Sequence, residues 1–188
     1  KGQLRVLDIS DPANPHEVFF VEGFQWAMEL AIVQNLLLVA NNAMGVWLLD
    51  LSTPGKPVTL GSLEIKQAAT CLDTGKNTVF IGDASGNLTV IDITQPKTAV
   101  ILGTHKLAES IFDLSVSGDT LFMAAGQAGL VSVDISQPGS PRQLASAPTP
   151  FADGILVDGN DAYLTDFAMG IFHYDLSNPA RPVQIGHN

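Results

Sequence analysis

The chain has few of the residues that several classes of binding and catalytic site require. Its 188 residues include one cysteine, four histidines and nine lysines and arginines, against nineteen aspartates and glutamates. A lone cysteine excludes an internal disulfide, and the histidines show none of the close spacings of zinc sites. The net charge of -10 repels phosphate backbones and anionic membrane surfaces, which argues against nucleic acid as a partner.

Long apolar runs and targeting signals are missing as well. The longest apolar run covers residues 30–40, and Gln34 and Asn35 interrupt it. A membrane-spanning helix needs about 20 consecutive apolar residues, so we expect no transmembrane segment in this chain. The chain opens without Met and without a signal-like stretch, and we expect it to be part of a longer or processed polypeptide.

The sequence does contain one short motif that recurs five times. An apolar strand ends in Asp, a Ser or Thr stands two residues later, and a Pro stands four residues later. The anchoring aspartates are Asp8, Asp50, Asp92, Asp134 and Asp175. They recur at nearly constant intervals of about 42 residues, a period typical of stacked or circularly arranged β units.

Each unit divides into four short runs rich in Val, Ile, Leu, Phe and Thr, which in the third unit cover residues 70–74, 78–83, 88–93 and 100–107. Gly, Asn, Asp and Pro separate these runs, and no helical period appears. The pattern predicts an all-β fold, a β-propeller of four-stranded antiparallel blades.

The predicted single propeller domain, or portion of one, covers residues 1–188. It divides into a half blade at residues 1–23 and blades at residues 24–65, 66–107, 108–149 and 150–188. Because a closed ring protects its sheet edges, we expect five or more blades in the intact ring, with about four and a half in this segment.

A small residue stands directly before the third strand of each complete unit. It is Gly45, Gly129 or Gly170 in three units and Asn87 in the unit between them. We expect a left-handed or bulged backbone at all four positions, because Gly and Asn tolerate that conformation.

Two copies of the repeated motif resemble the repeat of a known family. Residues 90–96, Val-Ile-Asp-Ile-Thr-Gln-Pro, and residues 131–141, Val-Ser-Val-Asp-Ile-Ser-Gln-Pro-Gly-Ser-Pro, resemble the LVIVD repeat of bacterial and archaeal propeller proteins. The resemblance covers essentially the whole chain. It implies a β-propeller, often in an exported or cell-surface protein with other modules attached, and usually no assigned enzymatic activity. An extracellular, periplasmic or cell-surface location is therefore expected.

The repeated aspartates could in principle ring a metal, but one per blade is too widely spaced for a single ion. We interpret Asp8, Asp50, Asp92, Asp134 and Asp175 as structural turn residues that accept hydrogen bonds from backbone N–H groups of the following turn.

A second set of acidic residues is expected at the mouth of the central channel. Half a repeat before the motif aspartates stand Glu29, Cys71, Asp113 and Gly154, with Asp153 beside the last. Closer to the motif, where the second run of each unit ends, stand Asn41, Asp83, Ala125 and Asp166. Carboxylates around one cavity would suit calcium or a basic group on a ligand. The alternative is that each carboxylate caps its own turn.

Aromatic and thioether side chains fall in the neighbouring loops. The candidate interaction face consists of Trp26, Met28, Phe112, Phe151 and Phe167. Such residues are enriched in the cores of protein interfaces. Packing between neighbouring blades is the alternative explanation.

The sequence favours a non-catalytic propeller scaffold that interacts with a protein, peptide or glycan. No constellation of acid, base and nucleophile emerges, and Cys71 lies in an apolar inner strand typical of an inert thiol. Two alternatives stay open: a propeller enzyme or cation-binding module with an acidic axial site, and a structural spacer without a specific partner.

Overall fold

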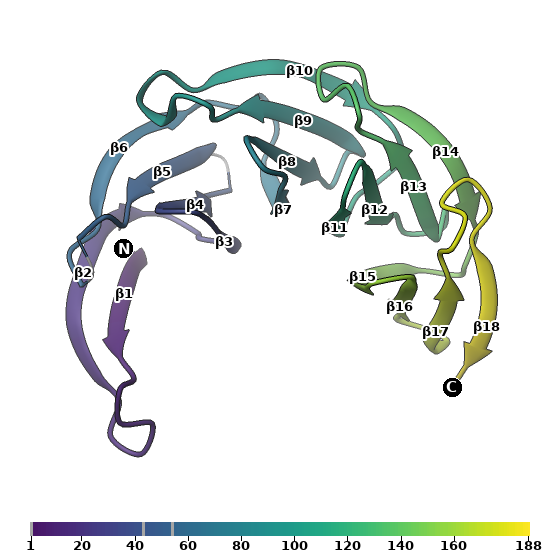
Figure 1. Ribbon diagram of the computed structural model, residues 1–188, viewed down its shortest axis with the longest axis horizontal. Helices are drawn as coiled ribbons and strands as arrows, with labels where there is room; N and C mark the ends of the chain where they lie inside the picture. The colour runs from purple at the N-terminus through teal and green to yellow at the C-terminus, as the bar shows by residue number, and fades with distance from the viewer. Residues whose placement is uncertain (1, 43, 54) are drawn as a thin grey trace.

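Five antiparallel sheets fan out around a common axis in the computed structural model, which describes residues 2–42, 44–53 and 55–188 (Figure 1). The first sheet has two strands, β1 (Gly2–Asp8) and β2 (His16–Phe24). The other four sheets have four strands each. The predicted all-β propeller of four-stranded blades is confirmed.

The four complete blades follow one another in chain order. Their strands are β3 (Glu29–Val33), β4 (Leu36–Ala40), β5 (Val46–Asp50) and β6 (Val58–Leu63); β7 (Ala69–Thr74), β8 (Thr78–Asp83), β9 (Asn87–Asp92) and β10 (Val100–Lys106); β11 (Asp113–Ser117), β12 (Thr120–Ala124), β13 (Leu130–Asp134) and β14 (Arg142–Ala147); and β15 (Ala152–Asp158), β16 (Asp161–Asp166), β17 (Gly170–Asp175) and β18 (Val183–His187). One short 3-10 turn, η1 (Pro96–Thr98), connects β9 to β10.

Within each complete blade the strands pair in chain order, and we name them a, b, c and d. Strand a lies on the inner side of the arc and strand d on the outer side (Figure 1). The a-to-b and c-to-d turns therefore share one face of the arc, which we call the lower face. The d-to-a and b-to-c loops share the opposite face, the upper face.

The b and c strands make up the core because neighbouring blades cover both of their faces. All five residues of β4 are buried, as are four of the five residues of β12. One cluster joins Phe80 and Leu88 to Leu121, Met123 and Val131 of the next blade. Because the core covers strands b and c of the inner blades on both sides, the surface open to a partner lies on the two faces of the arc, on its ends and along the exposed outer strands.

The b-to-c loops contain the predicted left-handed residues with one exception. Gly45, Gly129 and Gly170 have φ values of +74°, +69° and +85°. The prediction for Asn87 was wrong, because the positive φ of +77° belongs to Gly86. The positive φ thus lies six residues before the motif aspartate in this blade and five residues before it in the other three.

The arc is open between the first and last sheets, and the two chain ends lie far apart across it (Figure 1). Strands β1 and β2 match strands c and d of a blade, since β1 ends at the motif residue Asp8. In the part of the chain that the structure describes, no helix has the length and apolar character needed to cross a membrane.

Candidate functional site

The five motif aspartates each close a turn on the lower face. In each case Oδ1 accepts a hydrogen bond from the backbone N–H of the Ser or Thr two residues later, at 2.7 to 3.0 Å. The side-chain hydroxyl and the backbone N–H of that Ser or Thr both stabilise the ionised carboxylate, so the pKa of each aspartate lies below its usual value. The geometry is that of an Asx turn.

The inner-strand carboxylates link neighbouring blades. Glu29 on β3 accepts a hydrogen bond from the backbone N–H of Leu72 on β7, with 2.6 Å between N and Oε2. Asp113 on β11 accepts one from the N–H of Ile155 on β15, at 2.8 Å. Each side chain thus accepts a hydrogen bond from a backbone N–H of the next inner strand. Asp113 also accepts a hydrogen bond through Oδ1 from the N–H of Leu114 in its own strand, at 2.8 Å.

Asp73 makes the same kind of link and was not among the predicted residues. Its Oδ2 accepts a hydrogen bond from the N–H of Val116 in the next blade, at 2.6 Å. The position half a repeat before Asp92 is Cys71, two residues short of Asp73. Because side chains alternate along a strand, Cys71 and Asp73 share one face of β7. A search at the same face, two residues on, would have found it.

The linking carboxylates lie close enough together to repel one another. Burial raises the pKa of Glu29 above its usual value. The negative charges of Asp113 and Asp73 raise it further, whereas the hydrogen bond from the Leu72 N–H lowers it. Burial also raises the pKa of Asp113, with smaller contributions from Asp73 and Asp153. These four side chains therefore form one acidic strip along the inner strands.

No triplet of His, Cys, Asp or Glu side chains in residues 2–42, 44–53 and 55–188 is placed to hold a metal ion. Asp153, the exposed member of the strip, accepts a hydrogen bond from the Thr165 hydroxyl at 2.6 Å. The strip provides negative charge along the axis rather than a compact set of ligands.

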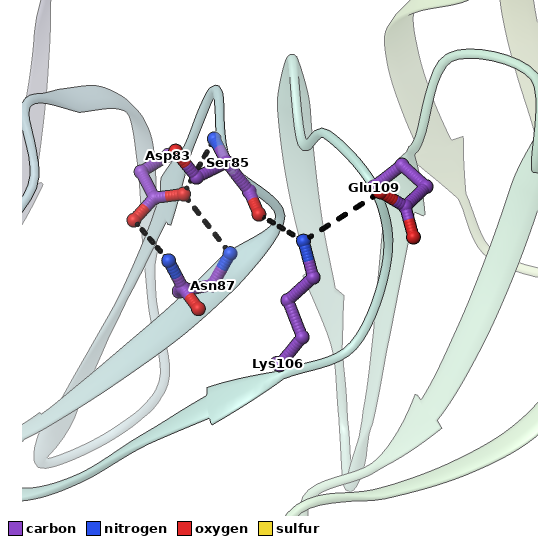
Figure 2. A network of polar contacts seen from close by, with 5 residues as sticks. All are labelled: Asp83, Ser85, Asn87, Lys106 and Glu109. Atoms are coloured by element: carbon purple, nitrogen blue, oxygen red, sulfur yellow. Dashed lines mark hydrogen bonds and ion pairs between the residues drawn. The ribbon is translucent and has the colours of Figure 1, made fainter.

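Asp83 anchors the b-to-c loop of its own blade from a buried position. Its Oδ1 accepts hydrogen bonds from the backbone N–H groups of Ser85 and Asn87, at 2.8 and 3.0 Å, and its Oδ2 accepts one from the Asn87 side chain. Figure 2 shows this network beside Lys106, which donates to the Ser85 carbonyl and approaches Glu109. Asp83 therefore shapes the loop and has little capacity left for a ligand.

Asp166 anchors loops of the last blade by similar hydrogen bonds. Its Oδ2 accepts a hydrogen bond from the Phe151 N–H at 2.7 Å, and its Oδ1 accepts from Ala168 and Met169 at 2.9 and 3.0 Å. Although burial opposes ionisation, these N–H groups hold the pKa of Asp166 below its usual value. The buried carboxylate thereby fixes the two upper-face loops that carry Phe151 and Phe167.

Three of the predicted aromatic residues come together on the upper face, across two blades. The ring centres of Phe112 and Phe151 are 5.0 Å apart, and those of Phe151 and Phe167 are 6.4 Å apart. Phe112 is half-buried, whereas Phe151 is 39% and Phe167 85% exposed. We call Phe112, Phe151 and Phe167 the aromatic patch.

Trp26 and Met28 lie on the upper face of the first complete blade. They are 73% and 51% exposed, so packing between blades covers only part of each side chain. Asn41 fixes the loop before β3, because its Oδ1 accepts hydrogen bonds from the N–H groups of Gln25 and Trp26, both at 3.1 Å.

Cys71 is buried between two blades. Burial raises the pKa of its thiol to about 12, so the thiolate that a nucleophile requires is not formed at neutral pH.

A groove on the lower face, of about 380 Å³, has no counterpart in the sequence predictions. It lies between the first two complete blades, and its lining includes Lys76, Lys97, Asn77 and Asp50. Its residues come from turns that the repeat makes for structural reasons, so the pattern did not distinguish them.

Comparison with known families agrees with this architecture. The LVIVD repeat matches residues 1–22, 76–104, 110–149 and 151–187, which together make up more than half of the chain. The chain belongs to the LVIVD-repeat family. A search of curated proteins found no match.

Solved structures similar to this LVIVD-repeat chain include two computationally designed proteins. The designed Ika8 protein superposes with a TM-score of 0.69 at 19% identity, over 85% of this chain and 48% of the other. The designed Ika4 protein superposes with a TM-score of 0.66 at 19% identity, over 82% of this chain and 94% of the other. This chain thus spans about half the length of Ika8. At such identities the likeness shows the fold alone.

Proposed function

We propose that this LVIVD-repeat propeller is a non-catalytic scaffold whose upper face binds an extended protein or peptide segment through the aromatic patch. The single observation that carries the proposal is the cluster of Phe112, Phe151 and Phe167, which is contiguous across two blades, with Phe151 partly and Phe167 largely exposed. Contiguous exposed aromatic surface is typical of interface cores.

The surroundings of the patch suit a binding role. Asp166 holds both patch loops from below, which limits the conformational entropy that binding would cost. Exposed Asp153 stands two residues from Phe151 and belongs to the acidic strip. The expected ligand is therefore a segment with an apolar anchor residue and a neighbouring Lys or Arg.

A randomised peptide library displayed on phage and selected on the immobilised chain tests the proposal. We expect enrichment of peptides that pair an apolar anchor with a basic residue. The double variant Phe151→Ala and Phe167→Ala should weaken the selected peptide at least about tenfold, as truncation of central aromatic anchors does. Fluorescence anisotropy of the labelled peptide measures the change.

The matched control is the double variant Val183→Ala and Ile185→Ala. These side chains are 48% and 55% exposed on the outer strand β18, away from the upper-face loops. This double variant removes exposed apolar surface and leaves the aromatic patch unchanged, so it should bind the peptide as the unmodified chain does. Equal losses in both double variants, or enrichment of glycans on an array with no peptide selected, would contradict the proposal.

The calcium site and the exported location remain separate predictions. The acidic strip supports attraction of cations to the axis, although each of Glu29, Asp73 and Asp113 already accepts a backbone N–H. A cell-surface location is in keeping with a binding scaffold and rests on the family resemblance.

A further inference from the structure

The lower-face groove between the first two complete blades has a lysine at two positions where the repeat places small or uncharged residues. Sixteen residues before the motif aspartate of the second complete blade stands Lys76. The other complete blades have an uncharged residue with a left-handed φ there, namely Gln34 at +55°, Gly118 at +58° and Gly159 at +60°. Five residues after the same aspartate stands Lys97, where the other units have Ala13, Gly55, Gly139 and Ala180. The repeat itself therefore requires neither lysine, and both line the groove.

Neither of these two lysines has a carboxylate partner. Among the described residues, Lys106 is the one lysine that forms an ion pair. Lys76 and Lys97 are both exposed. Asp50 also lines the groove, but its Oδ1 already accepts hydrogen bonds from the hydroxyl and the backbone N–H of Ser52. These two bonds lower the pKa of Asp50 most, and the charge of Lys97 adds to the effect, so Lys97 and Asp50 lie close enough to interact.

The groove reverses the sign of the protein's charge locally. The whole chain has a net charge of -10 and only nine lysines and arginines. The residues that line the groove include two lysines and one aspartate, which leaves a local charge of +1. A singly charged anion would neutralise this charge. A doubly charged anion such as phosphate would leave an excess negative charge in a chain that already repels anions.

The two turns that carry the lysines are held in place by the blade. The Ile93 N–H donates to the Asn77 carbonyl, with 2.9 Å between N and O, and joins the c-to-d turn to the a-to-b turn. The turn η1, which contains Lys97, contacts strand β6 of the preceding blade. Because these turns are already fixed, a ligand would order little additional backbone, and the entropic cost of binding is small.

Apolar and neutral polar side chains complete the lining of the groove. Leu36 and Ile93 are buried, and Leu60 and Pro96 are half-buried. The neutral polar members are Gln34, Asn35, Ser52, Asn77, Thr94 and Gln95. The volume of about 380 Å³ lies at the small end of the range for small-molecule sites. The lining thus suits a small ligand with a charged end, a short apolar body and a neutral polar group.

We propose that this groove binds a small organic monocarboxylate, with its carboxylate between Lys76 and Lys97 and its apolar body against Leu36 and Ile93. Two ammonium groups would donate charge-assisted hydrogen bonds to the carboxylate. The groove is on the lower face between the first two complete blades, whereas the aromatic patch is on the upper face of the last two. The site therefore does not rest on the function proposed above.

N-acetyl-leucine is a suitable probe, because it combines a carboxylate, an amide and a short apolar side chain. Its titration into the isotope-labelled 188-residue chain, followed by NMR, should give saturable shifts at the backbone amides of Lys76, Asn77, Thr94 and Lys97. The double variant Lys76→Gln and Lys97→Gln should weaken binding at least about tenfold, since it removes two charge-assisted hydrogen bonds. The neutral analogue N-acetyl-leucinamide should bind the unmodified chain at least about tenfold more weakly than the carboxylate does.

The matched control is the double variant Lys66→Gln and Arg181→Gln. It removes the same charge at two exposed positions outside the groove, and should bind N-acetyl-leucine as the unmodified chain does. The proposal is overturned if no saturable shifts occur in the groove, if the neutral analogue binds equally well, or if both double variants lose binding to the same extent. Displacement of the probe by inorganic phosphate at a lower concentration than by acetate would overturn the assignment to a monocarboxylate.

Discussion

Replacement of Gly129 by Ala should lower the free energy of unfolding by about 4 kcal/mol, from backbone strain and overpacking together. Gly129 has a φ of +69°, a conformation in which a Cβ is strained. A Cβ there would also lie 2.0 Å from the Ala147 carbonyl oxygen, at the end of strand β14. Strand pairing within the blade prevents that backbone from moving away, so the clash cannot be relieved by a rotamer change. Urea unfolding followed by tryptophan fluorescence measures the loss.

Gly118→Ala is the matched control. Gly118 has a similar φ of +58°, yet nothing lies within 4 Å of a Cβ at that position. Only the backbone conformation is then penalised, at about 1 kcal/mol. Losses of equal size at Gly118 and Gly129 would contradict the close approach of the b-to-c loop to strand d.

Replacement of Asp166 by Ala should cost about 3 kcal/mol of stability, because three backbone N–H groups lose the buried carboxylate that accepts their hydrogen bonds. Asp166 is 4% exposed and accepts hydrogen bonds from the N–H groups of Phe151, Ala168 and Met169. The three donor residues, Phe151, Ala168 and Met169, lie in the upper-face loops of the last blade. We therefore expect the variant to loosen the aromatic patch and to weaken its peptide ligand as well.

Thermal unfolding and amide exchange at Phe151 measure these two effects. Asp153→Ala is the control, since Asp153 is exposed and accepts a hydrogen bond from the Thr165 hydroxyl alone among the described contacts. It should change stability by less than about 0.5 kcal/mol, as is usual for exposed positions. A stable Asp166→Ala variant with an unchanged exchange rate at Phe151 would show that the carboxylate does not hold the loop.

The blades could be predicted because the repeated motif marks the same position of strand c in every unit. A motif aspartate in every repeat, with Ser or Thr two positions later, defines the end of strand c in each unit. Local turn chemistry then determines where strand d begins. Prediction failed where the repeat varies by one residue, because a fixed offset pointed to Asn87 whereas the glycine that adopts the positive φ is Gly86, one residue earlier.

The candidate site was harder to predict because its contacts cross between blades. The sequence pointed to Glu29 and Asp113, but their N–H donors, Leu72 and Ile155, lie 43 and 42 residues further along the chain. Nothing local specifies that neighbouring inner strands approach within hydrogen-bonding distance. Asp73 was overlooked for the same reason, since it reaches the next blade from a position two residues off the expected offset.

Exposure is the other quantity that the pattern does not contain. Phe112, Phe151 and Phe167 could be selected as loop aromatics, yet their contact with one another depends on how the last two blades adjoin. Likewise, the apolar character of Leu7 and Ile9 is ordinary for strand c. Their exposure is unusual, and it arises because β1 pairs with β2 alone in a two-stranded sheet.

Amide hydrogen exchange followed by NMR tests the central claim, a fan of four-stranded blades preceded by a two-stranded sheet whose strand β1 has no strand b beside it. The account predicts slow exchange at Ile93, Ile135 and Leu176, whose N–H groups bond to strand b, and fast exchange at Ile9 in the equivalent position. Fast exchange at all four would contradict the blade pairing, and equally slow exchange at Ile9 would show that the edge of β1 is already covered.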